Sequence, residues 1–442
     1  MRRALLLAFA LTATAAPRAH AFCGFFVGKA DGQLFNKSSQ VALVRDGDRT
    51  VLTMSNDYQG PLSEFALVVP VPSVLTRDQI HVGNRKLLER LDAYSSPRLV
   101  EYTDPDPCEV RRRVFEGVGG AMLPMMASSD RMKEFSKAMG VTIEAAYTVG
   151  EYDILLLSAT QSEGLEAWLR ESGYRIPPHA SRALAPYIKQ DMKFFVAKVN
   201  LKEQKKAGFQ ELRPLQIAYE SPRFMLPIRL GMANADGPQD LIVYTLTRNG
   251  RVESSNYQTV KIPSDAEVPE FVQKEFGEFY KATFTKAWKQ NGQRAVITEY
   301  FWNMGWCDPC AAPPLDQAEL RELGVFWVDA PTGPLRSRGG GVPVTLTRLH
   351  VRYDAEHFPE DLMFQETGDQ QNFQGRYVMN HPFKGEMKCE ARESYLTSVR
   401  ERRRREGSTL ASLTGWSEAK IRERMGADLP IQPDPWWKKL WK

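Results

Sequence analysis

The residues of this sequence best suited to covalent chemistry are Cys307 and Cys310, which are separated by two residues. Two thiols at this spacing can close a disulfide with each other, and a thiolate can attack a disulfide in another protein. A structural clip and a redox-active pair use the same two sulfur atoms, so the spacing alone leaves both interpretations open. A zinc site would need a second pair of ligands, and the histidines show no matching spacing, so we predict no metal site.

The run Trp306-Cys307-Asp308-Pro309-Cys310 resembles the W-C-x-P-C motif of thioredoxin-like proteins. The resemblance implies that Cys307 would attack as a thiolate and that Cys310 would resolve the mixed disulfide. The motif follows a predicted strand and precedes a predicted helical stretch, and Val342-Pro343 is the match for the cis-proline of that family. Aromatic residues beside the thiols would form a docking surface for substrates, although we predict that they belong to the core; these are Tyr300, Phe301, Trp302 and Trp306.

Three further cysteines, Cys23, Cys108 and Cys389, complete an odd set of five. If Cys307 pairs with Cys310, one more bridge can form among these three, and the sequence does not choose between the three pairings. In an exported chain such bridges are the expected state, because the surroundings are oxidising.

A second candidate site lies on a strand predicted over 344–353. Its period-two alternation places Arg348, His350 and Arg352 on one face. Two cations beside a histidine would hold an anionic group or lower the pKa of that histidine. The acidic residues that follow would instead neutralise the arginines in a salt-bridged surface strand; they are Asp354, Glu356, Glu360 and Asp361. We therefore weigh an anion-binding or hydrolytic site against a structural ion-pair network.

The N-terminus has the order of features typical of a secretory signal. Arg2-Arg3 precedes an apolar run over 4–16, and Ala19-His20-Ala21 supplies a small-residue cleavage pattern. We predict cleavage near Ala21 and export of the mature chain to the periplasm or the cell exterior. The apolar run is too short to cross a bilayer, and we predict no transmembrane segment.

The charge balance gives no reason to expect a nucleic-acid partner. The 58 basic and 54 acidic residues give a net charge of +4, and loss of the three arginines of the leader reduces it to +1. Residues 384–442 carry a surplus of five positive charges, concentrated in Arg400–Arg405, which we expect to form a solvated helix face. The aromatic and basic run 436–442 predicts weak contact of the C-terminal tail with a membrane surface.

The elements that would position these residues are mostly strands. Apolar runs and alternation predict strands over 41–45, 50–54, 65–70, 142–149, 153–157, 193–201, 215–219, 224–230, 241–246, 295–302 and 344–353, with a hairpin turn at 46–49. Helices are predicted over 87–94, 269–290, 315–323, 389–405 and 417–425. Because strands outnumber helices and do not alternate with them regularly, we predict an α+β fold with strand-rich mixed sheets.

The polar run 202–206 is the best internal boundary. We therefore divide the chain into a signal peptide at 1–21, a strand-rich region at 22–205, an α+β region with the cysteine pair at 206–383, and a basic helical tail at 384–442. This division predicts one or two domains followed by the helical tail.

Several motifs are specific in combination. They are Cys23-Gly24-Phe25-Phe26, Phe65–Pro72, Asp104-Pro-Asp-Pro-Cys108, Cys307-Asp-Pro-Cys310, Thr347–Tyr353 and Pro359–Leu362. Together they resemble one bacterial family, catalogued as domain of unknown function 2330. The resemblance extends from about Phe22 to Arg392 and implies an exported bacterial protein, but it transfers no catalytic residue.

The sequence has no GxSxG, HExxH, P-loop or GxGxxG motif. We therefore expect a non-enzymatic binding or structural protein of the periplasm or cell exterior, with no cofactor and with a protein or small-molecule ligand. The alternative is a thiol–disulfide oxidoreductase that uses Cys307 and Cys310.

Overall fold

The computed structural model describes most of the chain. The described residues are 39–55, 67–108, 140–172, 180–207, 212–232, 237–306, 312–328 and 343–426, with the backbone of short strands at 25–26, 35–36 and 58–59 and at residue 66. Cys23, Cys307, Cys310 and the aromatic tail at 436–442 lie outside the described residues.

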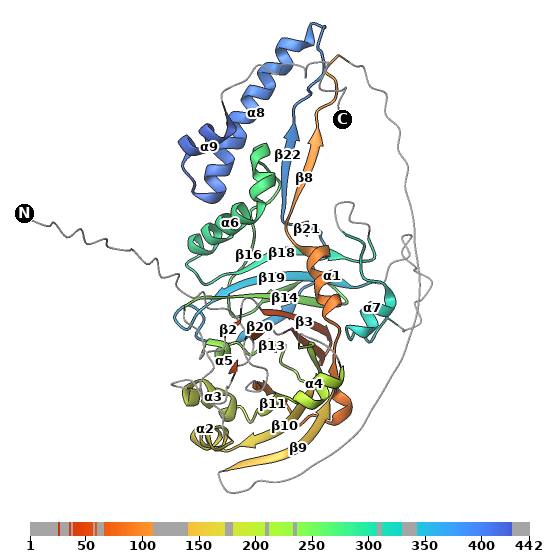
Figure 1. Cartoon of the computed structure of the whole chain (residues 1–442), viewed down its shortest axis with the longest axis vertical. Coiled ribbons are helices and arrows are strands. Elements are labelled where there is room, and N and C mark those ends of the chain that lie inside the picture. The colour runs from red at the N-terminus through yellow and green to blue at the C-terminus, as the bar shows by residue number, and fades with distance from the viewer. Residues whose placement is uncertain are drawn as a thin grey trace, which may run out of the picture.

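A nine-stranded mixed sheet forms the centre of the molecule (Figure 1). In spatial order it contains β16 (Thr259–Lys261), β18 (Val296–Asn303), β19 (Thr345–Tyr353), β14 (Gln239–Thr247), β3 (Ser39–Asp46), β4 (Arg49–Ser55), β12 (Leu215–Glu220) and β7 (Ile80–Val82), with β21 (Phe373–Gln374) paired to β18. The β14–β3 and β16–β18 pairs are parallel, and the other pairs are antiparallel. Strands from both sides of residue 205 share this sheet, and the polar run 202–206 lies in helix α4 (Leu201–Ala207).

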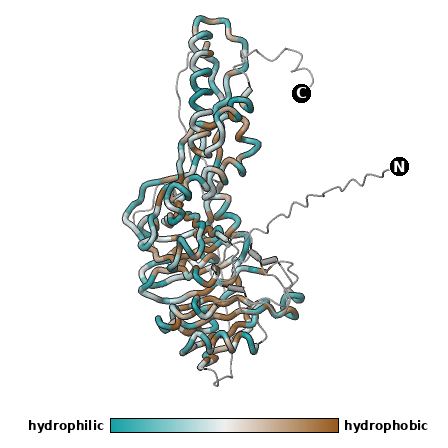
Figure 2. Tube along the Cα trace, turned by 90° about the vertical axis from the view of Figure 1, so that its left-hand side faces the viewer, coloured by the Kyte–Doolittle hydropathy of each residue, from teal (hydrophilic) through white to brown (hydrophobic). Residues whose placement is uncertain are grey.

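A second, antiparallel sheet packs against one face of the main sheet. Its strands are β1 (Phe25–Phe26), β6 (Ala66–Val71), β11 (Lys193–Val199), β10 (Tyr152–Ala159) and β9 (Val141–Val149). The alternation of β3 explains the layering, since Val41 and Leu43 face the second sheet whereas Ala42 and Val44 face the helices α1 (Arg85–Ser95) and α7 (Gln317–Glu322). Helices α2 (Ser162–Glu171) and α3 (Ala180–Lys189) cover the outer face of the second sheet. The fold is therefore α+β, and apolar residues concentrate in its strands (Figure 2).

Smaller elements complete this body. They are a three-stranded sheet of β13 (Met225–Leu226), β20 (Leu362–Glu366) and β15 (Val252–Ser254), a pair of β2 (Phe35–Asn36) and β5 (Tyr58–Gln59), the 3-10 turn η2 (Arg77–Gln79) and the short helix α5 (Arg229–Met232). The strand predicted over 224–230 is only two residues long, β13, and the short helix α5 follows it. Pro227 ends the strand, because it has no N–H to donate to a ladder.

An arm projects from the body (Figure 1). It contains a sheet of β17 (Ala266–Glu267), β22 (Arg376–His381) and β8 (Arg98–Thr103), with the helical elements η3 (Glu270–Glu275), α6 (Phe276–Gln290), α8 (Ala391–Thr414) and α9 (Glu418–Met425). Its core is a small apolar cluster from all of these layers, including Val272, Phe279, Tyr377, Leu410 and Ile421.

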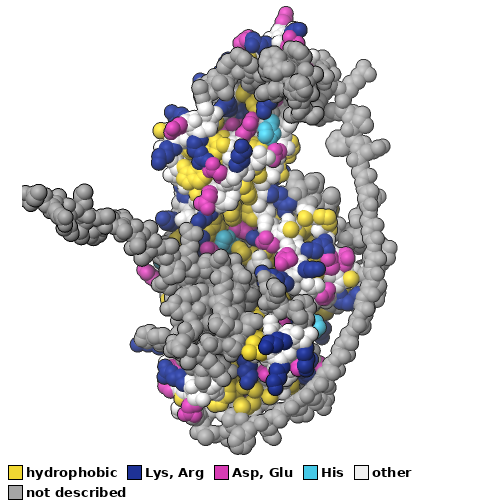
Figure 3. Space-filling view, in the orientation of Figure 1, with side chains coloured by type: hydrophobic (Ala, Val, Ile, Leu, Met, Phe, Trp, Pro, Cys, Tyr) yellow, Lys and Arg dark blue, Asp and Glu magenta, His cyan; other side chains and the backbone are white. Residues whose placement is uncertain are grey.

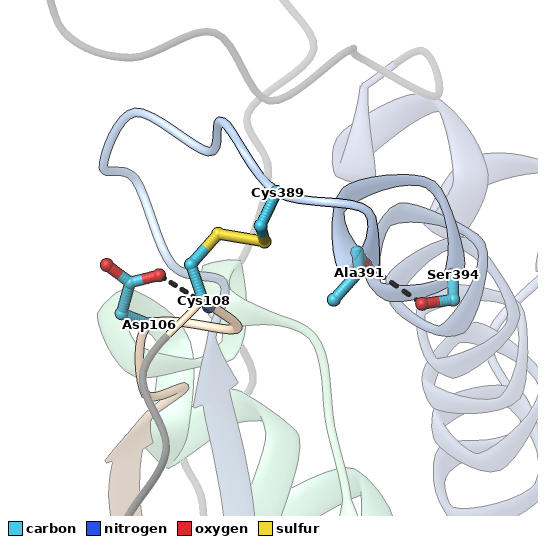
Figure 4. The surroundings of a disulfide bond; sticks show 5 residues. All are labelled: Asp106, Cys108, Cys389, Ala391 and Ser394. Carbon is cyan, nitrogen blue, oxygen red and sulfur yellow. Dashed lines mark hydrogen bonds between the residues drawn. A yellow bond between two sulfur atoms is a disulfide. The ribbon is translucent and has the colours of Figure 1, made fainter.

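A disulfide between Cys108 and Cys389 closes the arm near its tip, where it joins the turn after β8 to the start of α8 (Figure 4). Beside it, Asp104 accepts hydrogen bonds from both terminal nitrogens of Arg402, at 2.9 and 2.7 Å, and from the hydroxyl of Tyr395 at 2.7 Å. A covalent bond and a bidentate ion pair therefore tie α8 to the strand pair.

Two helices differ in extent from their predictions. The helix predicted over 269–290 begins as the 3-10 turn η3, because Glu275 leaves the helical region at φ −131° and ψ 24°, and the α-helix starts at Phe276. The helix predicted to end at Arg405 continues to Thr414, where Gly415 in the left-handed conformation (φ 76°) ends it. Among the described helices, none has an apolar stretch long enough to cross a bilayer.

Candidate functional site

The strand β19 carries the charged cluster that the sequence offered as a site. Arg348, His350 and Arg352 lie on the face of the main sheet that α1 and α6 cover, as the alternation predicts. The prediction of a surface strand is wrong, because β19 lies between β14 and β18 and the side chain of Arg348 is only 8% exposed. We call Asp92, Asp240, Glu299, Arg348, His350 and Arg352 the β19 cluster.

Arg348 is held by two carboxylates. Its Nε donates to Glu299 Oε2 at 2.5 Å, and its Nη1 donates to Asp92 Oδ1 of α1 at 2.6 Å. The hydroxyl of Tyr244 lies 3.2 Å from Nη1 and donates to the same Asp92 oxygen at 2.9 Å. Strand β18, strand β14 and helix α1 thus converge on one guanidinium.

His350 links the two halves of the cluster. Its Nδ1 lies 2.7 Å from Glu299 Oε1, and its Nε2 lies 3.1 Å from Asp240 Oδ1. Asp240 in turn accepts two hydrogen bonds from Arg352, each at 2.9 Å. Since both ring nitrogens face carboxylates, His350 can satisfy them both only as an imidazolium that donates twice.

Helix α6 covers this part of the sheet. The ring of Phe284 stacks on that of His350 at 3.7 Å between centroids, and Trp288 Nε1 donates to the carbonyl of Arg352 at 3.0 Å. The hydroxyl of Tyr280 bonds to Glu299. These contacts leave the Glu299 carboxylate fully buried.

The pKa shifts follow from this geometry. Burial would raise the pKa of Glu299, but the charges of His350 and Arg348 outweigh burial and lower the pKa to about 2. Burial would lower the pKa of His350, but the charges and hydrogen bonds of Glu299 and Asp240 together outweigh burial and raise that pKa. The prediction that two flanking arginines would lower the pKa of the histidine is therefore wrong, because both ring nitrogens of His350 lie within hydrogen-bond distance of carboxylates.

The β19 cluster consists of three cations and three carboxylates, so its charges balance. The two arginines and the histidine bond to the three carboxylates of the cluster, and Arg352 also donates to the hydroxyl of Thr285 in α6. An incoming anion would have to displace one of these carboxylates from its cation. The arrangement is chemically suited to fixing the sheet to its helices.

The acidic residues that follow β19 have other partners than predicted. Asp354 accepts from the backbone and the ring of His357, at 2.9 and 2.8 Å. Asp361 is buried, where it accepts from the hydroxyl of Tyr187 at 2.6 Å and from the backbone N–H of Ile228 at 2.9 Å. The prediction that these residues neutralise the arginines is wrong, since β19 ends at Tyr353 and the chain then turns away.

Sequence reasoning missed the residues that complete the cluster. Glu299 is the only charged residue in the apolar run of β18, and a lone acid in a buried strand is a signal that a cation must face it. Asp240 and Asp92 carried no such signal, because the first lies at the start of a strand and the second on a mixed helix.

The frame of the cysteine pair is described on both sides, although Cys307 and Cys310 themselves lie outside the described residues. Before the pair, β18 ends at Asn303 in a turn, and Met304 N–H bonds to the carbonyl of Val344 at the start of β19. After it, Arg90 of α1 donates to the carbonyls of Pro313 and Pro314, at 3.2 and 3.0 Å. Helix α7 follows, with a capping box between Asp316 and Glu319. The strand and the helical stretch predicted around the motif are both present.

The aromatic residues of this region divide into two groups. Tyr300 and Phe301 are fully buried, as the core prediction required, and Trp302 is half-buried. Trp306 is 67% exposed, so the core prediction is wrong for the residue that directly precedes Cys307. The turn after β18 carries this indole beyond the end of the sheet.

The fold and the β19 cluster define the structural class of the protein. This is an α+β protein with two packed sheets, an ion-pair network under its helices and a disulfide-closed arm. The chain belongs to the domain of unknown function 2330 family, described as an uncharacterized protein conserved in bacteria, whose match spans residues 17–365. No curated protein and no solved structure matches the chain. The described residues contain no group of three or more histidine, cysteine or acidic side chains arranged for a metal ion.

Proposed function

We propose that the mature chain is an exported, non-enzymatic binding or structural protein of the periplasm or cell exterior. The observation that carries this proposal is the closure of the β19 cluster. The charged residues of this cluster form hydrogen bonds with one another and with Tyr244, Tyr280 and Thr285. Their arrangement supports a scaffold role rather than turnover.

The Cys108–Cys389 disulfide supports export, because such bonds persist in oxidising compartments. The test is to sequence the N-terminus of the protein recovered from periplasmic and extracellular fractions. We expect a chain that begins at Phe22, with Cys108 and Cys389 protected from thiol alkylation. A cytosolic chain that retains Met1 and has every thiol free would overturn the proposal.

The arm supports a binding role. Its strands and helices project from the body, and its core is small, so a disulfide and the Asp104–Arg402 pair hold its shape. A projecting element that is stabilised in this way can present its surface to a partner without needing that partner in order to fold.

The second candidate function is thiol–disulfide exchange by Cys307 and Cys310, and the exposure of Trp306 favours it. An exposed indole beside a reactive thiol offers an apolar surface to a substrate peptide. In this reaction the Cys307 thiolate attacks a substrate disulfide and releases one substrate thiolate. Cys310 then attacks the sulfur of Cys307, which releases the second substrate thiol and leaves an oxidised Cys307–Cys310 pair. Two electrons pass to the substrate, and an external dithiol must return them.

An insulin-reduction assay with dithiothreitol as the external dithiol separates the two functions. For a binding protein, we expect the mature chain and its Cys307→Ser variant to give the same rate as dithiothreitol alone. Turnover by the wild-type chain that is lost in Cys307→Ser would overturn the binding proposal and establish the oxidoreductase. Trp306→Ala then tests the docking surface, since it should raise KM and leave kcat unchanged.

A further inference from the structure

A groove runs along the exposed face of α6 where this helix meets the turn between α8 and α9. It has a volume of about 510 Å³, and we call it the α6–α9 groove. Helix α6 buries Phe279, Phe284 and Trp288 on its opposite face, so its polar face is left to line the groove. Its lining includes Glu278, Lys281, Lys286 and Lys289 of α6 and Trp416 of the turn.

The groove is positively charged. Lys281, Lys286 and Lys289 line it, and Glu278 is the one acidic residue among its lining residues. Glu278 lies 3.8 Å from Lys281, and since their side chains are 74% and 51% exposed this pair holds its partners weakly. Lys289 forms no ion pair with any residue that the structure describes. Figure 3 shows Lys and Arg side chains, with Asp and Glu side chains among them, around apolar ones on the face built by α6, α8 and α9.

The fold fixes the position of one of the three lysines, Lys286. The ammonium group of Lys286 bonds to the carbonyl of Ser412 in the last turn of α8, which holds its charge at the seam between the two helices. Trp416 contributes a half-buried indole to the lining, and its ring is backed by the guanidinium of Arg424 at 5.9 Å from the centroid. The groove thus combines one fixed cation, Lys286, with two exposed lysines and one apolar surface.

The spacing of the cations indicates the shape of the ligand. Lys281 and Lys289 are eight residues apart on a helix, which places them about 12 Å apart along its axis. Lysines bind carboxylates and phosphates alike as point charges, and none of the described lining residues is an arginine that would favour phosphate through bidentate hydrogen bonds. An open groove with three lysines of one helix and one indole fits an elongated chain of carboxylates with an apolar side chain.

We propose that the α6–α9 groove binds an acidic, extended segment of a partner protein, with its carboxylates on Lys281, Lys286 and Lys289 and an apolar side chain against Trp416. This inference rests on the proposed binding function and names the chemistry of the partner. Because the attraction is electrostatic, the affinity should fall as salt rises.

The experiment titrates the mature chain into a fluorescein-labelled peptide of alternating glutamate and leucine and follows anisotropy. We expect binding at low salt that weakens roughly tenfold or more in the Lys281→Glu/Lys289→Glu variant. The matched control is Lys202→Glu/Lys205→Glu on the exposed surface of α4, in the body and away from the groove, which makes the same change in net charge. It should alter the affinity by less than about twofold.

A peptide of alternating glutamate and serine tests the indole, because it keeps the charges and removes the apolar side chains. It should bind more weakly to the wild-type chain, and Trp416→Ala should abolish the difference between the two peptides. Equal losses in both charge-reversal variants would overturn the groove, as would binding to vesicles of anionic phospholipid without binding to the peptide. A failed titration overturns only the groove. The proposed binding function is overturned separately, if the same preparation shows turnover in the insulin-reduction assay that is lost in Cys307→Ser.

Discussion

Two buried glutamates show what decides the state of a charge in this protein. Glu299 lies in the body with no exposed surface, and Glu406 lies in the arm with a side chain that is 6% exposed. Glu299 meets an arginine, a histidine and a tyrosine hydroxyl, and its pKa is lowered to about 2. Burial raises the pKa of Glu406 to about 7, because its nearest cation does not outweigh burial.

The cause of this difference is the geometry of the partner arginine. Arg402 Nε lies 3.6 Å from Glu406 Oε1, outside a hydrogen bond, because the terminal nitrogens of Arg402 are engaged with Asp104. Glu406 Oε1 has no hydrogen-bond partner among the residues that the structure describes, whereas both oxygens of Glu299 are bonded. Equal burial therefore gives opposite pKa shifts, depending on how many donors the fold brings to the carboxylate.

The largest expected effect is that of Glu299→Gln. The substitution leaves Arg348 and His350 buried with one carboxylate fewer, and breaking a buried ion pair costs about 3–5 kcal/mol. We expect a loss of this size in the free energy of unfolding, measured by urea denaturation at pH 7. Because the pKa of Glu299 is lowered from 4.5 to about 2, its contribution is present above pH 4.5 and is lost as the pH falls toward 2. A loss below about 1 kcal/mol would show that the β19 cluster does not hold the sheet to its helices.

The second prediction concerns the arm alone. Cys108→Ser/Cys389→Ser removes the bond between the end of β8 and the start of α8, and loss of a disulfide costs about 2–4 kcal/mol. We expect amide exchange to accelerate in β8, β22 and α8, while the strands of the main sheet keep their protection. Equal acceleration in the body and the arm would show that the two regions unfold together and that the arm has no separate closure.

How far the sequence predicts these regions depends on the range of the contacts. The alternation of β19 correctly placed Arg348, His350 and Arg352 on one face, since strand geometry is local. Their partners Glu299 and Asp240 are 51 and 110 residues away from His350, and only the order of strands in the sheet brings them together. The hairpin at 46–49 was predictable because its two strands are neighbours in the sequence. The sheet that contains strands from both sides of residue 205 was not predictable, because its strands are far apart in the sequence.

The third prediction is a gain in stability. A group whose pKa rises on folding, as that of Glu406 does from 4.5 to about 7, stabilises the fold fully below pH 4.5 and loses this contribution as the pH rises through 7. The difference is on the order of 3 kcal/mol. Glu406→Gln imitates the protonated carboxyl, so it should match the wild type at pH 4.5 and exceed it in stability at pH 8. Urea denaturation of both chains across this range measures the effect, and parallel pH profiles would contradict it.

We expect the smallest effect on the free energy of unfolding from Glu220→Gln, which changes an exposed glutamate. Glu220 pairs with Arg49 at 3.1 Å on neighbouring strands of the main sheet, but their side chains are 73% and 68% exposed. Water already solvates both charges, and such pairs contribute about 0–1 kcal/mol. Glu220→Gln should therefore change the free energy of unfolding by less than about 0.5 kcal/mol at pH 7. The same atom exchange then gives a large loss at Glu299, a gain at Glu406 and almost nothing at Glu220. If Glu220→Gln cost as much as Glu299→Gln, hydrogen bonding within the core would not be what separates these carboxylates.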